Sequence, residues 1–573
     1  MTARLAPPFS EPHWQQVEQF LRSLTPQQAR WLGSYLADQP DAAPTSASGD
    51  RVLIAYGSET GNSEALAQQL ATLAGDAGIA VDVEELGRLR LRQLVKRRHL
   101  IVICSTHGDG DPPEPAETFH DALMDDSAPE LASLQYAVLA LGDSSYDHFC
   151  LTGQQLDTRL ASLGAQRLVP RQDCDVDFAR PARAWFDQVL TVLPRQADVQ
   201  PAASAATAPP RAAYSKTHPL TVEVIDNIRL SAEHRHAPIH HLELTLDEPL
   251  ALEPGDAVGI LADNPPSLVA ALLNATGLSG DEPVTVDSQA MPLVQALRQH
   301  LDLVVPSARF LTFWASLTGA PELLAQDEAE TKIKKAFLRQ CQVRDLIGGY
   351  PATPAPQALV DNLRPLQPRL YDVANSLSAL DDELHLTVKD FTYAFGDRQE
   401  AGIASRFLLN LQPGDPVRLY PHRNARFHLP ESADVPLILI ADGTGIAPYR
   451  AFLQAIENGE ARHPCWLIFS ERRFEEDFLY QVDLQQARAQ GALQHVDTAF
   501  REAHPSRDLA DAIGEQSERF HTWLEKGAHL YLCGDKARLG ACDKALECLY
   551  ERHAGAGSWK QLTREKRIHR NLY

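Results

Sequence analysis

Cysteine is scarce in this sequence. Among 573 residues there are eight cysteines, and no two of them are spaced C-x-x-C. Such scarcity excludes a disulfide-rich secreted framework. Because iron–sulfur clusters need several closely spaced thiolates, it also disfavours a cluster held by this chain. We therefore expect free thiols, a cytoplasmic location and no metal site.

Long apolar runs and excess positive charge are missing too. No stretch of about 18 apolar residues occurs, so we expect no membrane span. The start, MTARLAPPFSEPHWQQ, lacks a basic segment followed by an apolar one, so we expect no signal peptide. The formal net charge of −23 disfavours a nucleic-acid partner. This acidic balance serves either solubility or the steering of a basic partner surface.

Two stretches without apolar periodicity divide the chain. Residues 39–50 are small and polar, and residues 195–213 are rich in Ala and Pro, so both are predicted linkers. Helical spacing of apolar residues over 11–38 predicts a small helical pair before the first linker, and this pair is a candidate segment for homo-oligomer formation. The predicted order begins with a helical segment and linker at 1–50, a domain at 51–194 and a linker at 195–213.

The domain at 51–194 alternates strands with helices. Buried-strand runs occur at 52–56, 81–86, 99–106 and 136–143, and a helix is predicted at 63–74. This alternation predicts a parallel, doubly wound α/β sheet.

The second half changes character twice. β-like runs at its start and over 369–430, on either side of a largely helical section, predict a β-barrel at 214–430 with a helical insertion at about 263–350. From residue 436 β/α alternation resumes, which predicts a second doubly wound domain at 431–573.

Three loops in the first domain follow predicted strands. Hydroxyls and backbone N–H groups in Ser58–Asn62, at a helix start, suit a phosphate. Loops 105–110 and 141–146 end the next two strands, and ligands of open α/β sheets bind at such ends. His107 and Tyr146 could sandwich a planar ring. Taken singly, each loop is also compatible with an ordinary turn, and each ring with packing.

The second half carries its own strand-end motifs. Arg369, at a strand start, suits a pyrophosphate, and Gly402–Ser405 precedes a helix suited to the same group. Asp442–Pro448 contains Gly-Thr-Gly between a strand and a helix, the context of a dinucleotide loop, and Cys533–Asp535 ends another strand. The alternatives are a surface ion pair for Arg369 and simple packing for Cys533.

Together these motifs resemble the diflavin reductase family over nearly the whole chain. The segments Leu24–Trp31, Tyr214–Lys216 and Arg364–Leu366 are similar to the flavoprotein alpha subunit of assimilatory sulfite reductase. The resemblance implies a flavodoxin-like FMN domain, an FAD-binding barrel with a helical insertion and a ferredoxin-reductase-like nucleotide-binding domain. It implies electron transfer from NADPH, with NADH as an alternative donor, through FAD and FMN to a haem protein. The implied acceptor is the sulfite reductase haemoprotein subunit.

The resemblance also assigns residues to each ligand. Those implied for FMN are Ser58, Glu59, Thr60, Gly61, Asn62, Ser105, Thr106, His107, Gly108, Gly110, Leu141, Gly142, Asp143, Tyr146, His148, Phe149 and Cys150. Those implied for FAD are Arg369, Tyr371, Asp372, Thr387, Gly402, Ala404 and Ser405. Those implied for the nicotinamide nucleotide are Gly443, Thr444, Gly445, Arg501, Cys533, Asp535 and Tyr573, the last covering the FAD ring.

Two departures from the family lie where hydride would enter. The family usually has Ser at position 372 and Asp at position 571, whereas this chain has Asp372 and Asn571. We hypothesise that the carboxylate near Cys533 has moved from 571 to 372, where it would still stabilise positive charge on the nicotinamide. The catalytic candidates are thus Asp372, Cys533, Asn571 and Tyr573. The alternative is neutral drift.

Two further departures affect the nucleotide pocket. Phe500-Arg501 stands where the family has Ser-Arg, and the Lys-x-Tyr that follows in the family is absent. Arg501 is the candidate ligand of the 2′-phosphate of NADPH, and Arg507 is a second candidate. Loss of the Lys and Tyr could relax the nucleotide preference toward NADH. Ala441 replaces the first Gly of the nucleotide loop. These changes leave two alternatives open, a reductase for a P450 or another flavoprotein, and a degenerate scaffold subunit. For a reductase, the acidic Asp109, Asp111 and Glu114 are candidate docking residues.

Overall fold

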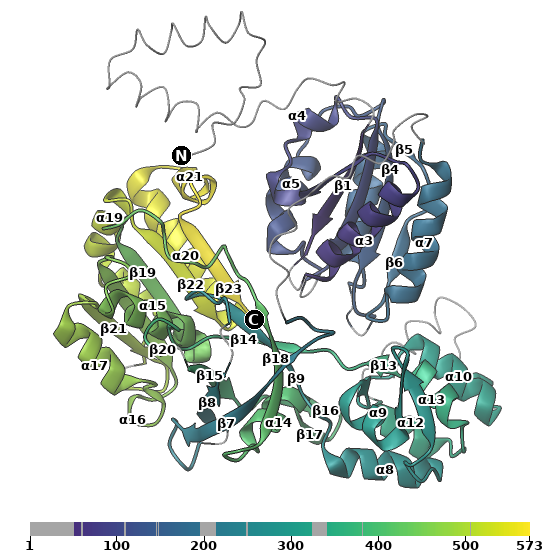
Figure 1. Ribbon diagram of the computed structural model, residues 1–573. Helices are drawn as coiled ribbons and strands as arrows, with labels where there is room; N and C mark the ends of the chain where they lie inside the picture. The colour runs from purple at the N-terminus through teal and green to yellow at the C-terminus, as the bar shows by residue number, and fades with distance from the viewer. Residues whose placement is uncertain are drawn as a thin grey trace, which may run out of the picture. The chain divides into compact units, whose positions relative to one another are not determined.

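Figure 1 shows the computed structural model of the chain, which divides into two compact units, Met1–Ala202 and Ala203–Tyr573. The structure describes residues 51–194, 214–323 and 341–573, apart from 59–60, 108–109, 145, 147, 236, 248–249, 381 and 505. The predicted helical pair and both predicted linkers lie outside the described residues. Among the described residues, no helix is long and apolar enough to cross a membrane.

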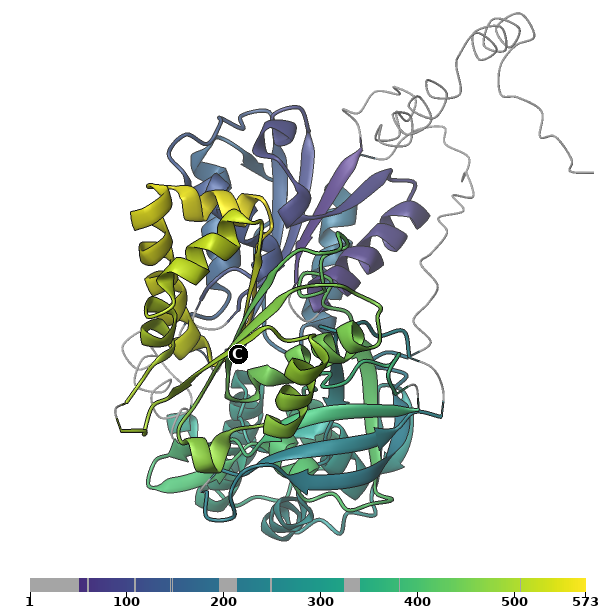
Figure 2. The same ribbon diagram turned by 90° about the vertical axis from the view of Figure 1, so that its left-hand side faces the viewer.

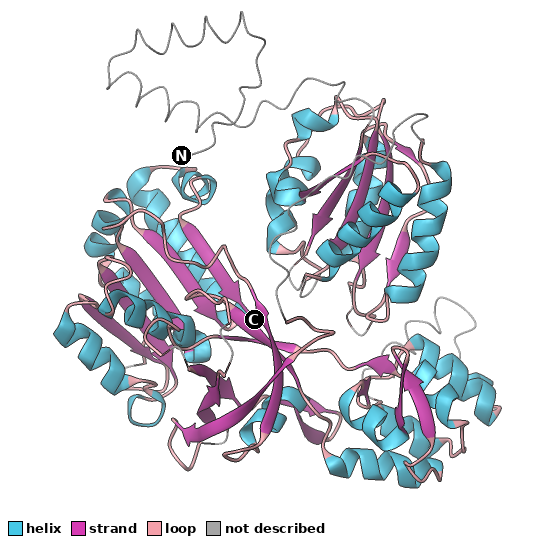
Figure 3. Ribbon diagram, viewed as in Figure 1, coloured by secondary structure: helices cyan, strands magenta, loops and turns pink. Residues whose placement is uncertain are grey.

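The first unit is a parallel sheet between two layers of helices (Figure 3). Its strand order is β2-β1-β3-β4-β5, with β6 also beside β4, so the order reverses between β1 and β3. The strands are β1 (Val52–Gly57), β2 (Val81–Glu85), β3 (His99–Ser105), β4 (Gln135–Leu141), β5 (Gln166–Arg167) and β6 (Gln172–Cys174).

Side chains alternate between the two faces of this sheet. One face packs on α3 (Asn62–Asp76) and α7 (Ala179–Val192), and the other on α5 (Glu114–Met124) and α6 (Leu151–Ser162). The turns η1 (Leu86–Arg88) and α4 (Leu91–Leu94) follow β2. A parallel sheet with both faces covered needs apolar residues on both sides of each strand, and the runs in β3 and β4 meet that need. The predicted doubly wound fold is confirmed.

The second unit begins with an antiparallel sheet in the order β14-β9-β18-β7-β8-β15. A bridge between Val373 and Leu386 joins the chain just after β14 to β15, which brings the two ends of the sheet together as a barrel requires. The strands are β7 (Leu220–Arg229), β8 (Ile239–Thr245), β9 (Ala257–Leu261), β14 (Arg369–Asp372), β15 (Glu383–Lys389) and β18 (Pro416–His422). The hairpin β16 (Thr392–Phe395) and β17 (Arg398–Ala401) and the helix α14 (Ile403–Leu409) follow β15.

A helical insertion with its own core lies between β9 and β14. Phe310 and Trp314 stack at its centre, with ring centroids 5.5 Å apart. Its elements are α8 (Pro266–Thr276), β10 (Pro283–Val286), β11 (Gln289–Pro292), α9 (Leu293–Gln299), β12 (Leu301–Asp302), α10 (Ala308–Thr318), η2 (Pro321–Leu323), α12 (Val343–Gly349), α13 (Pro356–Asn362) and β13 (Arg364–Pro365). Helical structure continues past residue 350, because Pro356 begins α13 instead of breaking it.

The last part of the chain is a second parallel sheet, ordered β21-β20-β19-β22-β23 (Figures 1 and 3). The strands are β19 (Leu437–Asp442), β20 (Cys465–Glu471), β21 (His495–Phe500), β22 (His529–Gly534) and β23 (Ile568–Leu572). One face packs on α15 (Ala447–Glu457) and α17 (Gln481–Gln490), and the other on α18 (Leu509–Gly514), α19 (Ser517–Glu525), α20 (Lys536–Ala554) and α21 (Ser558–Arg564). The order reverses between β19 and β22, which makes the crevice there the expected ligand position.

Candidate flavin and nucleotide sites

The first candidate site lies at the carboxyl end of β1. Gly61 has a φ of +79° and leads into α3, and the Ser63 backbone N–H donates to Ser58 Oγ at 3.1 Å. The Ser63 hydroxyl is fully buried and has no partner among the described residues. A buried hydroxyl without a partner at a helix start fits an anionic ligand such as the FMN phosphate.

Two further loops pack beside each other at the same edge of the sheet. A Cβ on Gly110 would lie 2.8 Å from the Cβ of His148, and a Cβ on Gly142 would lie 2.8 Å from the Cys150 nitrogen. The loops after β3 and β4 are therefore in close contact. Tyr146 is 51 % exposed, so its ring is available to a planar ligand. Glu59, Thr60 and Gly108 lie outside the described residues.

The candidate FAD site lies on the barrel. Arg369 is exposed at the start of β14, and its side chain makes no hydrogen bond or ion pair with any residue that the structure describes. Gly402 precedes α14, and Phe391, 62 % exposed, packs so close that a Cβ on Gly402 would lie 3.0 Å from its ring. A free guanidinium, a helix start and exposed aromatic surface fit a dinucleotide with a pyrophosphate.

Three other residues predicted to bind FAD are buried or partly buried. Tyr371 lies in β14, where burial raises the pKa of its hydroxyl to about 12. Ala404 is buried in α14. Thr387 is 6 % exposed and its hydroxyl lies 2.6 Å from the hydroxyl of Tyr480, so it joins the barrel to the nucleotide-binding part.

The predicted hydride-entry residues lie together. Asn571 Nδ2 donates to Asp372 Oδ1 at 2.8 Å, and the Cys533 thiol donates to Asp372 Oδ2 at 3.6 Å. Burial raises the pKa of the Asp372 carboxyl to about 6, although both donors oppose the shift. Burial also raises the pKa of Cys533, so its thiol stays protonated. The two positions that depart from the family thus form one hydrogen-bonded pair.

The predicted nucleotide loop closes against the end of β22. The turn η3 (Gly443–Ile446) leads into α15, and a Cβ on Gly445 would lie 1.9 Å from the carbonyl oxygen of Cys533. Tyr573 lies 3.0 Å from Thr444 through their hydroxyls, and the chain terminus marked in Figure 2 is therefore at this loop. Asp535 caps α20 by accepting a hydrogen bond from the Arg538 backbone.

A network of acids and arginines at the same strand ends was not predicted from the sequence. The carboxylate of Asp442, 3 % exposed, accepts hydrogen bonds from Arg501 and Arg538. Arg501 was predicted as a nucleotide ligand, and the structure places it at these strand ends with an internal anion already bound. The signal was present in the sequence, since an acid stands directly before the Gly-Thr-Gly turn.

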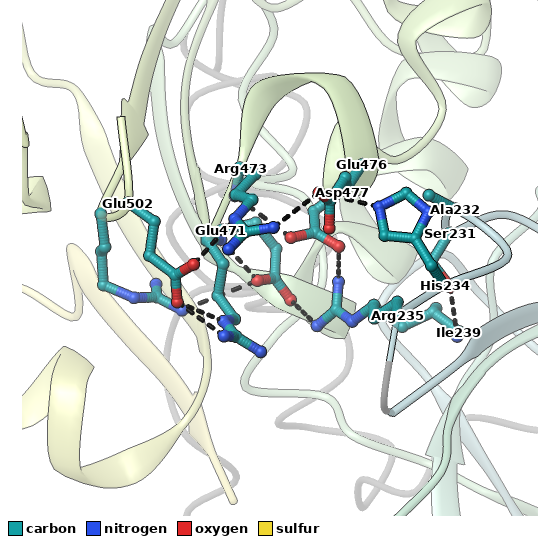
Figure 4. A network of polar contacts seen from close by, with 12 residues as sticks. Ser231, Ala232, His234, Arg235, Ile239, Glu471, Arg473, Glu476, Asp477 and Glu502 are labelled. Atoms are coloured by element: carbon teal, nitrogen blue, oxygen red, sulfur yellow. Dashed lines mark hydrogen bonds and ion pairs between the residues drawn. The ribbon is translucent and has the colours of Figure 1, made fainter. Parts of the chain in front are cut away.

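The network continues into the barrel (Figure 4). Arg235, 7 % exposed in the loop after β7, pairs with Glu471 at the end of β20 at 2.8 Å and with Asp477 at the end of α16 (Phe474–Asp477). Glu502 bridges Arg472 and Arg473 at 2.7 and 2.8 Å. These pairs hold the ends of β20 and β21 in place.

One group of potential metal ligands also lies between the barrel and the nucleotide-binding part. Donor atoms of His241, Glu243 and His385 lie within 4.8 Å of one another. Both ring nitrogens of His385 already have protein partners, Glu383 at 2.8 Å and Arg450 at 3.2 Å. Burial, with Arg450 nearby, lowers the pKa of His241 to about 3. These contacts give His241 and His385 a structural role.

Comparison with known families agrees with this order of sites. Three family models match the chain one after another: the flavodoxin model at residues 54–185, the FAD binding domain model at 212–407 and the oxidoreductase NAD-binding domain model at 439–543. Each matched range contains one of the candidate sites described above. The three-part organisation inferred from the motifs is thereby confirmed.

Curated relatives match the chain along almost its whole length. The sulfite reductase (NADPH) flavoprotein alpha-component of Shewanella sp. (strain MR-7) is 37% identical over 93% of this chain and 92% of its own. Its namesake in Bacillus subtilis (strain 168) is 36% identical over 93% of this chain and 92% of its own. That of Vibrio cholerae serotype O1 (strain ATCC 39315 / El Tor Inaba N16961) is 35% identical over 100% of this chain and 97% of its own. A likeness of this extent makes the chain a member of the sulfite reductase flavoprotein alpha-component family.

Proposed function

We propose that this protein moves electrons from NADPH through FAD and FMN to a haem-protein acceptor, the haemoprotein subunit of a sulfite reductase. The observation that carries this proposal is the near full-length match to relatives that bear the name of that flavoprotein. The order of the three matched domains supports it. When bound, the two flavins supply the redox chemistry, and the protein supplies binding, orientation and charge.

The residues described above take defined roles in this proposal. The hydroxyls and N–H groups of the loop after β1 hold the FMN phosphate, and Arg369 with the start of α14 holds the FAD pyrophosphate. The Gly443–Ile446 turn receives the nicotinamide nucleotide. The residues proposed as ligands remain those assigned by family resemblance, with boundaries at 51–194, 214–430 and 431–573 for the three domains.

Asp372 is proposed as the group that stabilises positive charge at the site of hydride entry. Its contacts with Asn571 and Cys533 support a relocated carboxylate. The test is stopped-flow reduction of the flavins in Asp372→Asn, with Asn571→Asp in the same background as the reciprocal change. We expect Asp372→Asn to slow reduction on the order of tenfold or more, and Asn571→Asp to restore part of that loss. An unchanged rate in Asp372→Asn would rule the relocation out.

The acceptor is proposed to dock on acidic surface beside the FMN loops. Asp111 is exposed there; of the other two predicted docking residues, Glu114 follows three positions later and Asp109 lies outside the described residues. Complementary charge would speed encounter with a basic partner surface. We also propose that the complex is cytoplasmic and that the N-terminal segment 1–50 supports a homo-oligomer.

Anaerobic titration of the purified protein with NADPH tests the central proposal. Bleaching of both flavins, followed by reoxidation on addition of the haemoprotein subunit, is the expected result. Co-purification with that subunit supports it over a P450 or a flavoprotein acceptor. If neither NADPH nor NADH bleaches the flavins, the protein is not a reductase and only a scaffold role is left.

A further inference from the structure

Asp442 lies where the phosphates of a dinucleotide are expected. It is the last residue of β19, directly before the Gly443-Thr444-Gly445 turn, at the crevice where the strand order reverses. A Cβ on Gly534 would lie 2.4 Å from the Asp442 carbonyl oxygen, so the ends of β19 and β22 are in contact. The crevice therefore holds a buried carboxylate of the protein itself.

This carboxylate is bound by two arginines. Arg501, which follows β21, donates from Nη1 to Asp442 Oδ1 at 2.8 Å. Arg538, in the first turn of α20, donates from Nε to Oδ2 at 2.8 Å and from Nη2 to the same oxygen at 2.5 Å. Three charge-assisted hydrogen bonds satisfy the carboxylate and orient both guanidinium groups.

Neighbouring arginines at the same edge have internal partners as well. Arg501 also lies 3.0 Å from Ser470 Oγ and 3.6 Å from Glu471. Arg472 and Arg473 share Glu502, which Figure 4 labels together with Arg473. These guanidinium groups are not free cations.

NADPH differs from NADH by one phosphate on the adenosine ribose. A site discriminates for that phosphate when arginines can bond to it without giving up another anion. Here, the phosphate would compete with the buried carboxylate of Asp442 for the positive charge of Arg501 and Arg538, and weakening the contacts of a buried acid opposes phosphate binding.

We propose that Asp442 is a specificity-determining residue. Its carboxylate acts as an internal anion that binds Arg501 and Arg538, and it thereby lowers the preference for NADPH over NADH. The inference rests on the proposed use of a reduced nicotinamide dinucleotide. It goes further in naming the group that sets the choice between the two nucleotides. NADPH still binds, but its extra phosphate adds little affinity.

The test uses two probes that need no redox step. Isothermal calorimetry on the full chain measures the dissociation constants of 2′,5′-ADP and of 5′-ADP, which differ by the 2′-phosphate alone. In the unaltered protein the ratio of the two constants is expected to be below tenfold. In Asp442→Asn the two arginines lose their closest anion, and the ratio is expected to rise by at least tenfold, the equivalent of one charge-assisted hydrogen bond.

Asp497→Asn is the matched control. Asp497 pairs with Arg519 at 3.0 Å in the same domain, and its removal changes the net charge equally, but it lies within β21 away from the crevice. Its ratio should equal that of the unaltered protein.

Three results would overturn the inference: a ratio of tenfold or more in the unaltered protein, an unchanged ratio in folded Asp442→Asn, or no binding of either probe. If Asp442→Asn does not fold, the ratio in the unaltered protein decides alone. Failure of the reductase proposal shows separately, as absence of flavin bleaching.

Discussion

Both parallel sheets of this chain present loops suited to phosphate, but their strand ends differ in charge. In the first unit, the Ser63 hydroxyl at the end of β1 is neutral and has no partner among the described residues. In the nucleotide-binding sheet, Arg501 and Arg538 are already bonded to Asp442. The Ser63 hydroxyl would only gain a contact when a phosphate binds, whereas at the second site a phosphate competes with an anion that is already bound. Strand-end geometry therefore locates a phosphate site, and the charge balance around it decides which phosphate is preferred.

The candidate FMN phosphate loop is open at Gly61, whereas the nucleotide loop is closed at Gly445, and glycine substitutions measure that difference. Gly445→Ala should lower the free energy of unfolding of the C-terminal unit by about 3 kcal/mol or more, because its Cβ would meet the backbone of Cys533. Gly61→Ala, whose Cβ would meet no described residue beyond its chain neighbours within 4 Å, should cost about 1 kcal/mol through its φ of +79° alone. Scanning calorimetry of the full chain measures both.

Gly540→Ala, in the interior of α20, is the control of opposite sign, because alanine favours a helix over glycine by about 1 kcal/mol and its Cβ would meet nothing within 4 Å among the described residues outside the helix. Equal losses in Gly445→Ala and Gly61→Ala would mean that the second loop does not depend on close approach.

The contrast between free and paired arginines can be tested on the barrel. Arg369→Gln should weaken FAD binding by at least tenfold, since loss of a charge-assisted hydrogen bond costs about 1.5–3 kcal/mol. The ratio of FAD to FMN released from the purified protein measures this. Arg423 also belongs to the barrel and lies 3.6 Å from Glu253, so Arg423→Gln should leave the ratio of FAD to FMN unchanged. Full FAD occupancy in Arg369→Gln would remove Arg369 from the site.

Asp372 should make the stability of the C-terminal unit fall with rising pH. Because folding raises the pKa of its carboxyl to about 6, the folded state holds the proton more tightly, and this stabilisation is lost between about pH 4 and pH 6. Asp372→Asn removes the loss, so the stability of the variant relative to the unaltered protein should be about 2 kcal/mol higher at pH 8 than at pH 4. Thermal unfolding at the two pH values measures the difference.

Asp345→Asn is the control. Because the Arg398 guanidinium lowers the pKa of Asp345, the stability of this variant relative to the unaltered protein should be lower at pH 8 than at pH 4. A pH-independent difference in Asp372→Asn would show that the carboxyl keeps its ordinary pKa.

The smallest effect is expected at Ser63. Ser63→Ala should weaken FMN binding about fivefold, the equivalent of about 1 kcal/mol for one neutral hydrogen bond. It should not destabilise the unit without FMN, because the hydroxyl has no protein partner to lose. Fluorescence titration with FMN and thermal unfolding of the flavin-free protein separate the two effects. Thr72→Ala, whose exposed hydroxyl donates to the Gln68 carbonyl in the same helix α3, is the control. Weaker folding in flavin-free Ser63→Ala would contradict the expectation.

Local patterns predicted most of the fold. Each strand predicted in the first unit ends within two residues of the observed one, because buried parallel strands are apolar on both faces. The insertion was predicted to end at about residue 350, but its last helix continues to Asn362. The PATPAP segment is ambiguous in sequence, because proline breaks a helix in its interior but begins one at its first position.

The charge network could not be read from local patterns. Asp442 bonds residues 59 and 96 positions away, and Arg235 reaches residues more than 230 positions on. Such pairs depend on which strand ends the topology brings together. The contact between Asp372 and Asn571, 199 positions apart, was expected only because family resemblance marked both positions as altered.

The pairing of Arg235 bears on how the protein can be cut into pieces. Its guanidinium, contributed by the barrel, is the partner of two acids of the nucleotide-binding sheet, and all three side chains are at most 3% exposed. A fragment beginning near residue 431 would keep Glu471 and Asp477 but lose their cation, leaving two like charges in a dry interior. Such a fragment should be poorly soluble when expressed alone and recover when the barrel is supplied in trans. The division that sequence patterns draw at that point separates two ligand sites but not two independently folding bodies.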